Sequence, residues 1–310
     1  MLIHEGYEGL KLRDPVVTLG IFDGVHRGHL ALLNKLVARA EEINGESVVI
    51  TFHPHPRLVL DKKPEGLFFL STMEEKTELL KKANVGNLII INFTPEFSKI
   101  KACDFVGNIL SGKIGTRHLI VGYDHHFGYR GEGNFETINE CAVSLGFVVE
   151  QAQGLHTGIG AISSSLIRDA LLNGKLEQAN SWLGYNYSLK GSVIDGRKIG
   201  RRIGFPTANI KPLDPNKLVP CNGVYAVEIV AAKDKILHGM LSIGVNPTVN
   251  ITSQQRSIEV NIFDFEEDIY GRELEVIFRY RLRDEVKFGD TDQLAQQMAR
   301  DEINARKLLG

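Results

Sequence analysis

The sequence predicts two domains: an α/β domain with a parallel sheet, followed by a small antiparallel β-barrel that ends in a helix. From residue 15 to about residue 153, short apolar runs alternate with segments of helical periodicity, which indicates strands buried on both faces of a parallel sheet. After about residue 184, apolar and polar residues alternate with a period of two, as in strands with one buried face. We therefore expect one domain at residues 1–184 and a second at residues 185–310.

Strands and helices are expected to alternate in the first domain. The predicted strands are 16–22, 47–52, 88–93, 118–123 and 147–150, and the predicted helices lie near 29–43, 72–84, 101–111 and 135–145. Thr72 and Glu75 predict a capping box at the start of the second helix. Ligands bind at the carboxyl ends of parallel strands, so the polar residues that follow these strands are site candidates. They are Asp23, His26, His53, His55, Asn92 and Asp124.

The second domain is expected to consist of successive strands joined by turns. In the segment 273–283, Leu274 and Val276 fall on one face of a strand, while charged residues fall on the other. Strands with almost no helix between them predict a small antiparallel barrel. Further strands are predicted at 224–230, 240–245 and 257–263, with a hairpin loop around Asp234. A helical pair at 164–172 and 176–183 precedes the barrel, and a helix at 291–309 follows it, with Thr291 as the expected N-cap.

The composition limits the classes of function. The net charge is −2 and both signs are interspersed, which argues against a nucleic-acid or anionic-membrane partner. Cys103, Cys141 and Cys221 are widely spaced, without a Cys-x-x-Cys pair. This pattern fits a reducing cytoplasm and argues against a disulfide framework and a cysteine zinc site. No signal peptide or membrane-spanning segment is recognisable, so a cytoplasmic location is expected.

The stretch 16–36 carries the first candidate site. A strand-like apolar run leads through a glycine turn into a helix, an arrangement that presents backbone N–H groups and a positive dipole end to an anion. His26 and His29 lie in this turn, on one face of the helix if it begins there. Both imidazoles could donate hydrogen bonds to a phosphoryl group that gains charge during reaction. The alternative is that they are ordinary polar residues at a helix start.

Two further strings in the first half admit both a structural and a functional interpretation. In TFHPHP, His53 and His55 could be zinc ligands, but no nearby cysteine or third ligand completes a set. In ISSSLIR, three serines precede an apolar helix and could simply be N-caps. The functional interpretation is that this helix start binds phosphate, which Arg168 reaches with its forked guanidinium.

These strings resemble those of bacterial FAD synthetases in their order along the chain: GIFDGVHRGH, TFHPHP, INF, VGYDHHFG and ISSSLIR. The first string is similar to the His-x-Gly-His signature of the nucleotidyltransferase superfamily. The resemblance implies a Rossmann-like nucleotidyltransferase domain that transfers the adenylyl group of ATP to FMN and releases pyrophosphate. His125 departs from the family pattern, which usually has an aromatic residue at that position.

The resemblance also implies roles for individual residues. His26, His29 and Arg168 would be catalytic and would stabilise the ATP phosphates, and Asn92 and His55 would contact the flavin. The ATP and phosphate pocket would contain Gly20, Phe22, Asp23, Gly24, Gly28, Asp124, Ser163, Ser164 and Ser165. Because the acceptor phosphate is already an anion at neutral pH, this transfer should need positioning and charge stabilisation rather than a general base.

The string GRKIGRRIGFPTANI, at 196–210, is the second candidate site. It fails the Walker A pattern and lacks the interleaved aromatic residues of a nucleic-acid surface. It could be a basic surface loop, or a phosphate cradle in which Thr207 and Asn209 offer oxygens to Mg²⁺. Transfer to a hydroxyl also needs a base, and the best candidate is Glu259, although most strand glutamates face solvent.

The second half resembles a riboflavin kinase domain in the strings GRRIGFPTAN, NGVYAV, SIGVNPT, IEVNIFDF, DIYGRELEV and LRDEVKF. The resemblance implies that Thr207 and Asn209 bind Mg²⁺ and ATP, and that Glu259 deprotonates the ribityl 5′-hydroxyl. Gly200, Gly204 and Pro206 would complete the ATP site.

Together the two resemblances imply a bifunctional enzyme that makes FMN from riboflavin and FAD from FMN. Its partners would be the small molecules riboflavin, FMN and ATP, without nucleic acid or membrane, and it would be a monomer or weak oligomer. Two alternatives remain open: an enzyme with kinase activity alone, and a non-catalytic regulator that responds to flavins.

Overall fold

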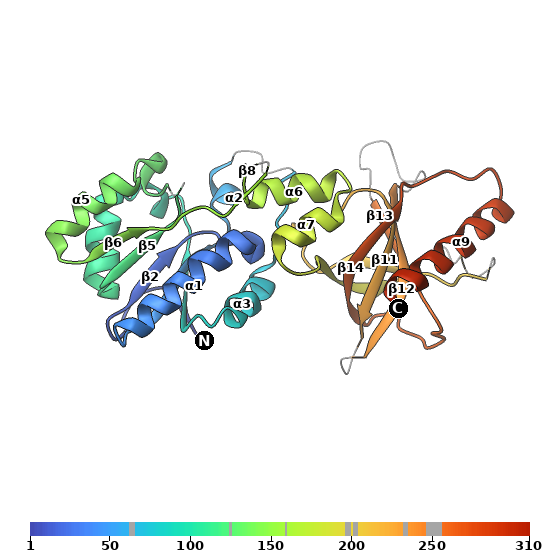
Figure 1. Ribbon diagram of the computed structural model, residues 1–310, viewed down its shortest axis with the longest axis horizontal. Coiled ribbons are helices and arrows are strands. Elements are labelled where there is room, and N and C mark those ends of the chain that lie inside the picture. Colours follow the sequence, from blue (N-terminus) through green and yellow to red (C-terminus); the bar gives the residue numbers. More distant parts are fainter. Residues whose placement is uncertain are drawn as a thin grey trace. The chain divides into compact units, whose positions relative to one another are not determined.

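The computed structural model describes residues 1–61, 66–123, 126–158, 160–195, 200, 204–231, 235–245 and 256–310. The chain divides into two compact units, Met1–Ser164 and Ser165–Gly310. Figure 1 shows the elements of each unit. The helices α6 (Ser164–Leu172) and α7 (Leu176–Leu183) belong almost entirely to the second unit. The domain boundary near Gly184 stays a prediction about where the two activities divide.

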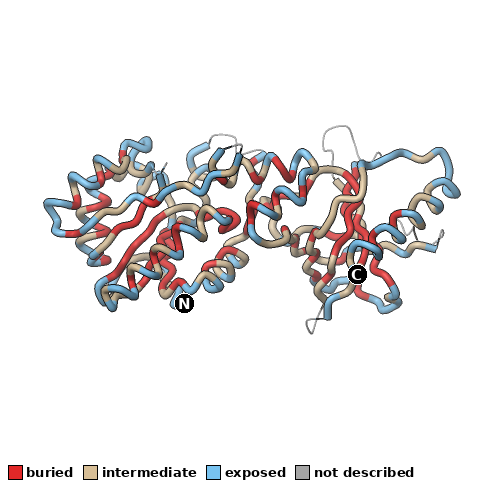
Figure 2. The backbone as a smooth tube through the Cα atoms, in the orientation of Figure 1, coloured by how far each residue is buried: buried red, intermediate tan, exposed pale blue. Residues whose placement is uncertain are grey.

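The first unit is built on a parallel sheet with the strand order β1-β4-β3-β2-β5-β6. Its strands are β1 (Leu2–Glu5), β2 (Val16–Leu19), β3 (Ser47–His53), β4 (Asn87–Asn92), β5 (His118–Val121) and β6 (Val148–Gln151). Figure 2 shows that the middle strands are buried while the outer faces of the helices are exposed. The predicted α/β fold is therefore confirmed.

Helices cover both faces of this sheet, which explains why its strands are apolar throughout. Leu33 of α1 and Leu80 of α3 pack on one face, and Val106 of η3 and Ile138 of α5 pack on the other. The helices are η1 (Asp23–Val25), α1 (Arg27–Glu42), α2 (Pro56–Leu60), α3 (Met73–Lys82), η2 (Phe97–Lys99), α4 (Ala102–Asp104), η3 (Phe105–Ile114), η4 (Tyr129–Gly131) and α5 (Phe135–Leu145). The short strands β7 (His156–Thr157) and β8 (Gly160–Ala161) pair with each other.

Three details of the first unit differ from the sequence-based expectation. β1 was not predicted, because it is a largely exposed edge strand that pairs with β4 and has no apolar run. The strand expected at 16–22 ends at Leu19, because Phe22 adopts a left-handed conformation with φ of 49°. The helix expected at 101–111 consists of α4 and the π-helix η3. The predicted capping box is confirmed, with Thr72 and Glu75 each accepting the other's backbone N–H.

The sequence argued against a disulfide framework, but the structure contains a disulfide. Cys103 on α4 and Cys141 on α5 form a disulfide, with 5.7 Å between their Cα atoms. They are 38 residues apart in the sequence and meet because α4 packs against α5. Their spacing alone could not reveal this tertiary contact. Cys221 is free.

The second unit is a closed antiparallel barrel with the strand order β10-β13-β12-β11-β14-β9, as predicted. Its strands are β9 (Ser188–Ile194), β10 (Ala208–Pro212), β11 (Gly223–Val230), β12 (Ile236–Val245), β13 (Arg256–Ile262) and β14 (Glu273–Arg283). The helix α9 (Thr291–Leu309) packs its Ala305 against Ala226 and Met240 of the barrel.

Two expectations for the second unit need comment. The N-cap of α9 is Asp290 rather than Thr291: the Asp290 carboxylate accepts the backbone N–H of Gln293 at 2.8 Å, and Thr291 is the first helical residue. The hairpin loop predicted around Asp234 lies outside the described residues. Among the helices that the structure describes, none combines the length and the apolar character needed to cross a membrane.

Candidate active sites

The turn after β2 places two histidines at the start of α1. The chain turns at Phe22 and again at Gly24, whose φ of 77° would strain any residue with a Cβ. It enters α1 with His26 as the N-cap, so that His29 lies in the first helical turn. The helix N-terminus and both imidazoles therefore come together at the carboxyl edge of the sheet.

A hydrogen bond determines which nitrogen of the His26 ring carries the proton. Its Nδ1 accepts the backbone N–H of His29 at 3.3 Å, so in the neutral ring Nε2 carries the proton and can donate it to a ligand. The two imidazoles stack, with ring centroids 3.7 Å apart. Gly28 leaves room for this pair, because a Cβ there would lie 3.1 Å from His26 Nδ1. The Nδ1 of His29 is buried and has no hydrogen-bond partner among the described residues.

Both rings are neutral at pH 7. Burial lowers the pKa of His26 to about 4. Burial, the neighbouring His26 and the nearby Lys76 ammonium hold the pKa of His29 well below its usual value. The pair is consequently a set of hydrogen-bond donors rather than a pair of cations, and the positive end of α1 adds to its attraction for an anion.

Asp23 holds the surrounding segments against this turn. Its carboxylate accepts the backbone N–H groups of Leu70 at 2.9 Å and Ser71 at 3.0 Å. The Ser71 hydroxyl in turn accepts the N–H of Gly24 at 2.9 Å. From the start of α6, the Ser164 hydroxyl donates to the Asp23 carbonyl oxygen at 2.9 Å. The structure thus shows Asp23 bound to protein groups, and its predicted contact with ATP stays a prediction.

A cavity of about 600 Å³ opens beside Gly20, at the same edge of the sheet. Aromatic side chains form much of its wall, namely Phe52, Phe93, Phe97, Phe105 and Phe127. His55 also lines it: its ring stacks on Phe69 at 4.8 Å, and its Nδ1 accepts the N–H of Arg57. Such a wall suits a flat aromatic ligand. Sequence reasoning missed these phenylalanines, because in a sequence they look like core residues.

The other predicted residues of the first site lie on several different elements. Asn92, at the end of β4, is exposed and pairs with His53 in the sheet, and it is not part of the cavity wall. Ser163 directly precedes α6, and Ser165 and Arg168 belong to the second unit, where the Arg168 guanidinium donates to the Ser165 hydroxyl at 3.2 Å. Asp124 and His125 lie outside the described residues.

In the part of the chain that the structure describes, no group of three or more His, Cys, Asp or Glu side chains is placed to hold a metal ion. His53 is exposed at the end of β3, and His55 is the N-cap of α2.

The second site forms where β10 and β13 pair. The antiparallel register places Asn209 opposite Glu259. Thr207 immediately precedes β10, and its hydroxyl donates to the Glu259 carboxylate at 3.2 Å. The Asn261 side chain donates to the Pro206 carbonyl oxygen at 2.7 Å and so holds the residue that precedes Thr207 in place. The structure therefore brings together Thr207, Asn209 and Glu259, which lie about fifty residues apart in the sequence.

Two cavities of the barrel meet at Thr207, which lines both. The larger has a volume of about 520 Å³ and is lined by residues such as Val193, Pro206 and Tyr270. The smaller has a volume of about 280 Å³, and Glu259 lies in its wall. Two ligands that occupied these cavities would approach each other beside the Thr207 hydroxyl and the Glu259 carboxylate.

Gly200 lies very close to Phe205 and Thr207. Its carbonyl oxygen accepts the N–H of Phe205 at 2.9 Å. A Cβ at this position would collide with the Phe205 carbonyl oxygen and lie 3.2 Å from the Thr207 hydroxyl, so only glycine fits. Gly204 has a φ of 85°, which also favours glycine. The rest of the basic loop, 196–199 and 201–203, lies outside the described residues.

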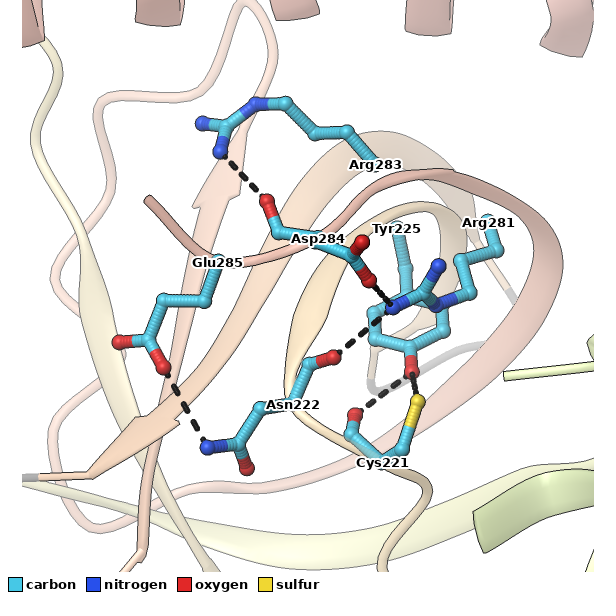
Figure 3. Close-up of polar contacts among 7 residues, drawn as sticks. All are labelled: Cys221, Asn222, Tyr225, Arg281, Arg283, Asp284 and Glu285. Atoms are coloured by element: carbon cyan, nitrogen blue, oxygen red, sulfur yellow. Dashed lines mark hydrogen bonds and ion pairs between the residues drawn. The ribbon is translucent and has the colours of Figure 1, made fainter. Parts of the chain in front are cut away.

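Figure 3 shows the polar contacts around Arg283 and Glu285, two residues that line the smaller cavity. Glu285, in the cavity wall, accepts a hydrogen bond from the Asn222 side chain at 3.3 Å. The Arg281 guanidinium donates both to the Asn222 carbonyl oxygen at 3.1 Å and to the Asp284 carboxylate at 2.5 Å. These contacts connect the start of β11 to the end of β14.

A partly buried ion pair joins α9 to the same wall. The Arg283 guanidinium contacts the Asp301 carboxylate at 2.7 Å, and both residues line the smaller cavity. Gln297 donates a further hydrogen bond to Asp301 at 2.9 Å. Leu294 and Met298 of α9 also line this cavity, so the C-terminal helix forms part of the site. The sequence offered no signal for the Arg283–Asp301 pair.

Comparison with known proteins places both units in characterised families. The family model of FAD synthetase matches residues 10–166, and that of riboflavin kinase matches residues 183–309. The bifunctional riboflavin kinase/FMN adenylyltransferase of Escherichia coli K12 is 37% identical over 297 residues, which cover 95% of this chain and 93% of that protein. The protein of the same name from Listeria monocytogenes is 38% identical over 293 residues, covering 94% of this chain and 92% of its own.

A solved structure shares the fold over the whole chain. It is a Streptococcus pneumoniae protein described as a macrolide-efflux protein, with a TM-score of 0.89, 30% sequence identity and coverage of 99% of both chains. The near-complete coverage by bifunctional relatives accords with the two separate sites described above. The chain belongs to the family of bifunctional riboflavin kinases/FMN adenylyltransferases, with its FAD synthetase part first and its riboflavin kinase part second.

Proposed function

We infer that this chain makes FAD in two ATP-dependent steps, by phosphorylating riboflavin to FMN and then adenylylating FMN. The observation that supports the proposed catalytic residues is a chemical difference between the two sites. The barrel places the Glu259 carboxylate against the Thr207 hydroxyl, whereas the α/β unit presents two neutral imidazoles at a helix N-terminus. A carboxylate can remove a proton from an alcohol, while neutral donors serve a nucleophile that is already an anion.

In the kinase step, Glu259 acts as the general base on the ribityl 5′-hydroxyl of riboflavin. The hydroxyl oxygen forms a bond to the γ-phosphorus of ATP, the bond from that phosphorus to the β–γ bridging oxygen breaks, and ADP leaves. Riboflavin occupies the smaller cavity and ATP the larger one. This assignment is supported by Glu259 lining the smaller cavity and by Thr207 lining both.

The residues around Glu259 fit a magnesium ion. Mg²⁺ prefers oxygen ligands and usually shares its coordination sphere with phosphates and water. The Thr207 hydroxyl and the Asn209 side-chain oxygen are such ligands, and the strand register holds Asn209 opposite Glu259. We propose that Thr207 and Asn209 hold the ion. When bound, it neutralises phosphate charge during the transfer.

In the adenylyl step, an oxygen of the FMN phosphate forms a bond to the α-phosphorus of ATP, and the bond to the bridging oxygen breaks to release pyrophosphate. His26 donates from Nε2 to the phosphate oxygens, because its Nδ1 is held by the backbone of His29. The aromatic cavity beside Gly20 takes the flavin ring. We propose that Arg168, Ser163, Ser164 and Ser165 also contact the phosphates of ATP.

We also propose that the enzyme works in the cytoplasm, as a monomer or weak oligomer, on small molecules alone. The mixed charge pattern and the net charge of −2 support the absence of a nucleic-acid partner. Light scattering coupled to size-exclusion chromatography measures the oligomeric state directly.

The experiment that tests the function is a product analysis. The purified chain is incubated with riboflavin, ATP and Mg²⁺, and the flavins are resolved by chromatography over time. We expect FMN to form first and FAD to follow. Accumulation of FMN without FAD would leave a kinase with an inactive first unit, and no conversion at all would favour a flavin-responsive regulator.

A further inference from the structure

Lys76 is a buried lysine beside the turn of the adenylyl site. It lies on α3, only 6% of its surface is exposed, and α3 packs against η1, which contains Asp23. The segment that leads into α3 is held there by the hydrogen bonds from Leu70 and Ser71 to Asp23. Buried ammonium groups are rare in proteins, because losing their hydration is costly unless another charge compensates for it.

Among the residues that the structure describes, none is a direct partner of this ammonium. Within the described part of the chain, the side chain of Lys76 makes no hydrogen bond or ion pair. Asp23, whose negative charge acts on Lys76, directs its carboxylate to the backbone N–H groups of Leu70 and Ser71. By contrast Lys217, which is also buried, lies over the Tyr187 ring at 4.6 Å.

The groups that face Lys76 come from two elements. Asp23 of η1 attracts it, and the His29 imidazole of α1 is close enough for the ammonium to lower the pKa of that ring. On α3 itself, one carboxylate oxygen of Glu75, Oε2, accepts the backbone N–H of Thr72 in the capping box. Burial lowers the pKa of Lys76 to about 8, although Asp23 opposes the shift. The side chain is therefore still mostly charged at pH 7.

We propose that the ammonium of Lys76 binds the β- and γ-phosphates of ATP, next to His29, and is a further catalytic residue of adenylyl transfer. This proposal rests on the proposed function of the first unit. When the bond between the α-phosphorus and the bridging oxygen breaks, its electron pair stays on the departing pyrophosphate. A cation at that place stabilises the growing charge and keeps its own proton throughout.

The test compares Lys76→Met and Lys76→Arg with Lys81→Met, which removes an exposed lysine from the same helix. FAD formation from FMN and ATP is measured, and phosphorylation of riboflavin serves as an internal control. We expect Lys76→Met to lower kcat/KM for FAD formation by about 100-fold, as for loss of a charge-stabilising group. Lys81→Met should retain the wild-type rate, and kinase activity should be unchanged in all variants.

Two readouts separate this role from a purely structural one. The wild-type rate of FAD formation should fall above about pH 8 as Lys76 loses its proton. The Lys76→Arg variant stays charged, so its rate of FAD formation should not fall in this pH range. Binding of inorganic pyrophosphate, measured by calorimetry, should weaken at least about tenfold in Lys76→Met. A structural lysine would instead lower the Tm of Lys76→Met and leave pyrophosphate affinity intact.

The outcomes also distinguish this proposal from the function on which it rests. If the wild-type chain makes FAD while Lys76→Met binds pyrophosphate and reacts at a near wild-type rate, only the role of Lys76 is overturned. If the wild-type chain makes no FAD, the proposed function of the first unit fails before Lys76 is considered.

Discussion

At the scale of single residues, the neutral state of His26 links the adenylyl site to stability. Its pKa of about 4 in the folded chain lies below the value near 6.5 that an unfolded chain has, so the unfolded state binds the proton more readily. This contribution to stability is fully present above about pH 6.5 and is lost as the pH falls towards 4. The difference corresponds to about 3 kcal/mol at most.

We therefore predict that His26→Asn, which cannot titrate in this range, loses less stability than the wild type between about pH 6.5 and pH 4. Denaturant unfolding at a series of pH values measures the difference. Parallel pH dependences of the two proteins would show that His26 is not held neutral by burial.

Gly200 gives a second prediction at the residue scale. An added Cβ would displace the Phe205 carbonyl and press on the Thr207 hydroxyl, so Gly200→Ala should misplace the phosphate-transfer site. We expect kcat/KM for riboflavin phosphorylation to fall by about tenfold or more, with FAD formation from supplied FMN intact. Gly289→Ala is the matched control, because a Cβ there meets only ordinary van der Waals contacts. Equal kinase rates in both variants would contradict the proposed role of Gly200.

At the scale of elements, Asp23 is expected to hold α3 and the turn after β2 together. Asp23→Ala would leave the N–H groups of Leu70 and Ser71 without their acceptor, and bonds to charged acceptors are strong. We predict a loss of about 2–4 kcal/mol in the free energy of unfolding. Asp61→Ala, which removes an exposed carboxylate paired with Arg57, should cost less than about 0.5 kcal/mol. Similar unfolding midpoints for the two variants would show that Asp23 does not clamp these segments.

The elements that the sequence predicted are those whose signal is local. Apolar runs identified β2 to β6, period-two alternation identified the strands β11 to β14, and the spacing of Thr72 and Glu75 identified a helix start. β1 escaped prediction because it is a largely exposed edge strand, and its partner in the sheet lies more than eighty residues away. The disulfide of Cys103 with Cys141 likewise depends on how two helices pack.

The same distinction between local and tertiary signals applies to the candidate sites. Short strings made His26, His29, Thr207 and Glu259 candidates, because these strings resemble motifs of the two families. The phenylalanines of the aromatic cavity were not identifiable, since a cavity wall and a core have the same composition. The clamp of Asp23 and the burial of Lys76 are also invisible in the sequence, because each depends on partners far along the chain.

At the scale of the whole molecule, we propose that the two units divide flavin cofactor synthesis by the nature of the nucleophile. A hydroxyl must lose a proton before or during attack, and we propose that Glu259 of the barrel accepts it. A phosphate is already charged, and on this proposal the α/β unit needs only hydrogen-bond donors and a helix N-terminus. FMN is the product of one unit and the substrate of the other. A substitution in the site of one unit should therefore abolish the reaction of that unit and leave the reaction of the other unit intact.

The most direct measurement is a crossed product analysis of Glu259→Gln and His29→Ala. Each variant is given riboflavin with ATP in one reaction and FMN with ATP in another, and FMN and FAD are quantified by chromatography. We predict that Glu259→Gln forms no FMN yet converts supplied FMN to FAD at the wild-type rate, and that His29→Ala forms FMN but loses FAD formation by about 100-fold. Loss of both reactions in either variant, or of neither, would contradict the division of the chemistry between Glu259 and the histidine pair.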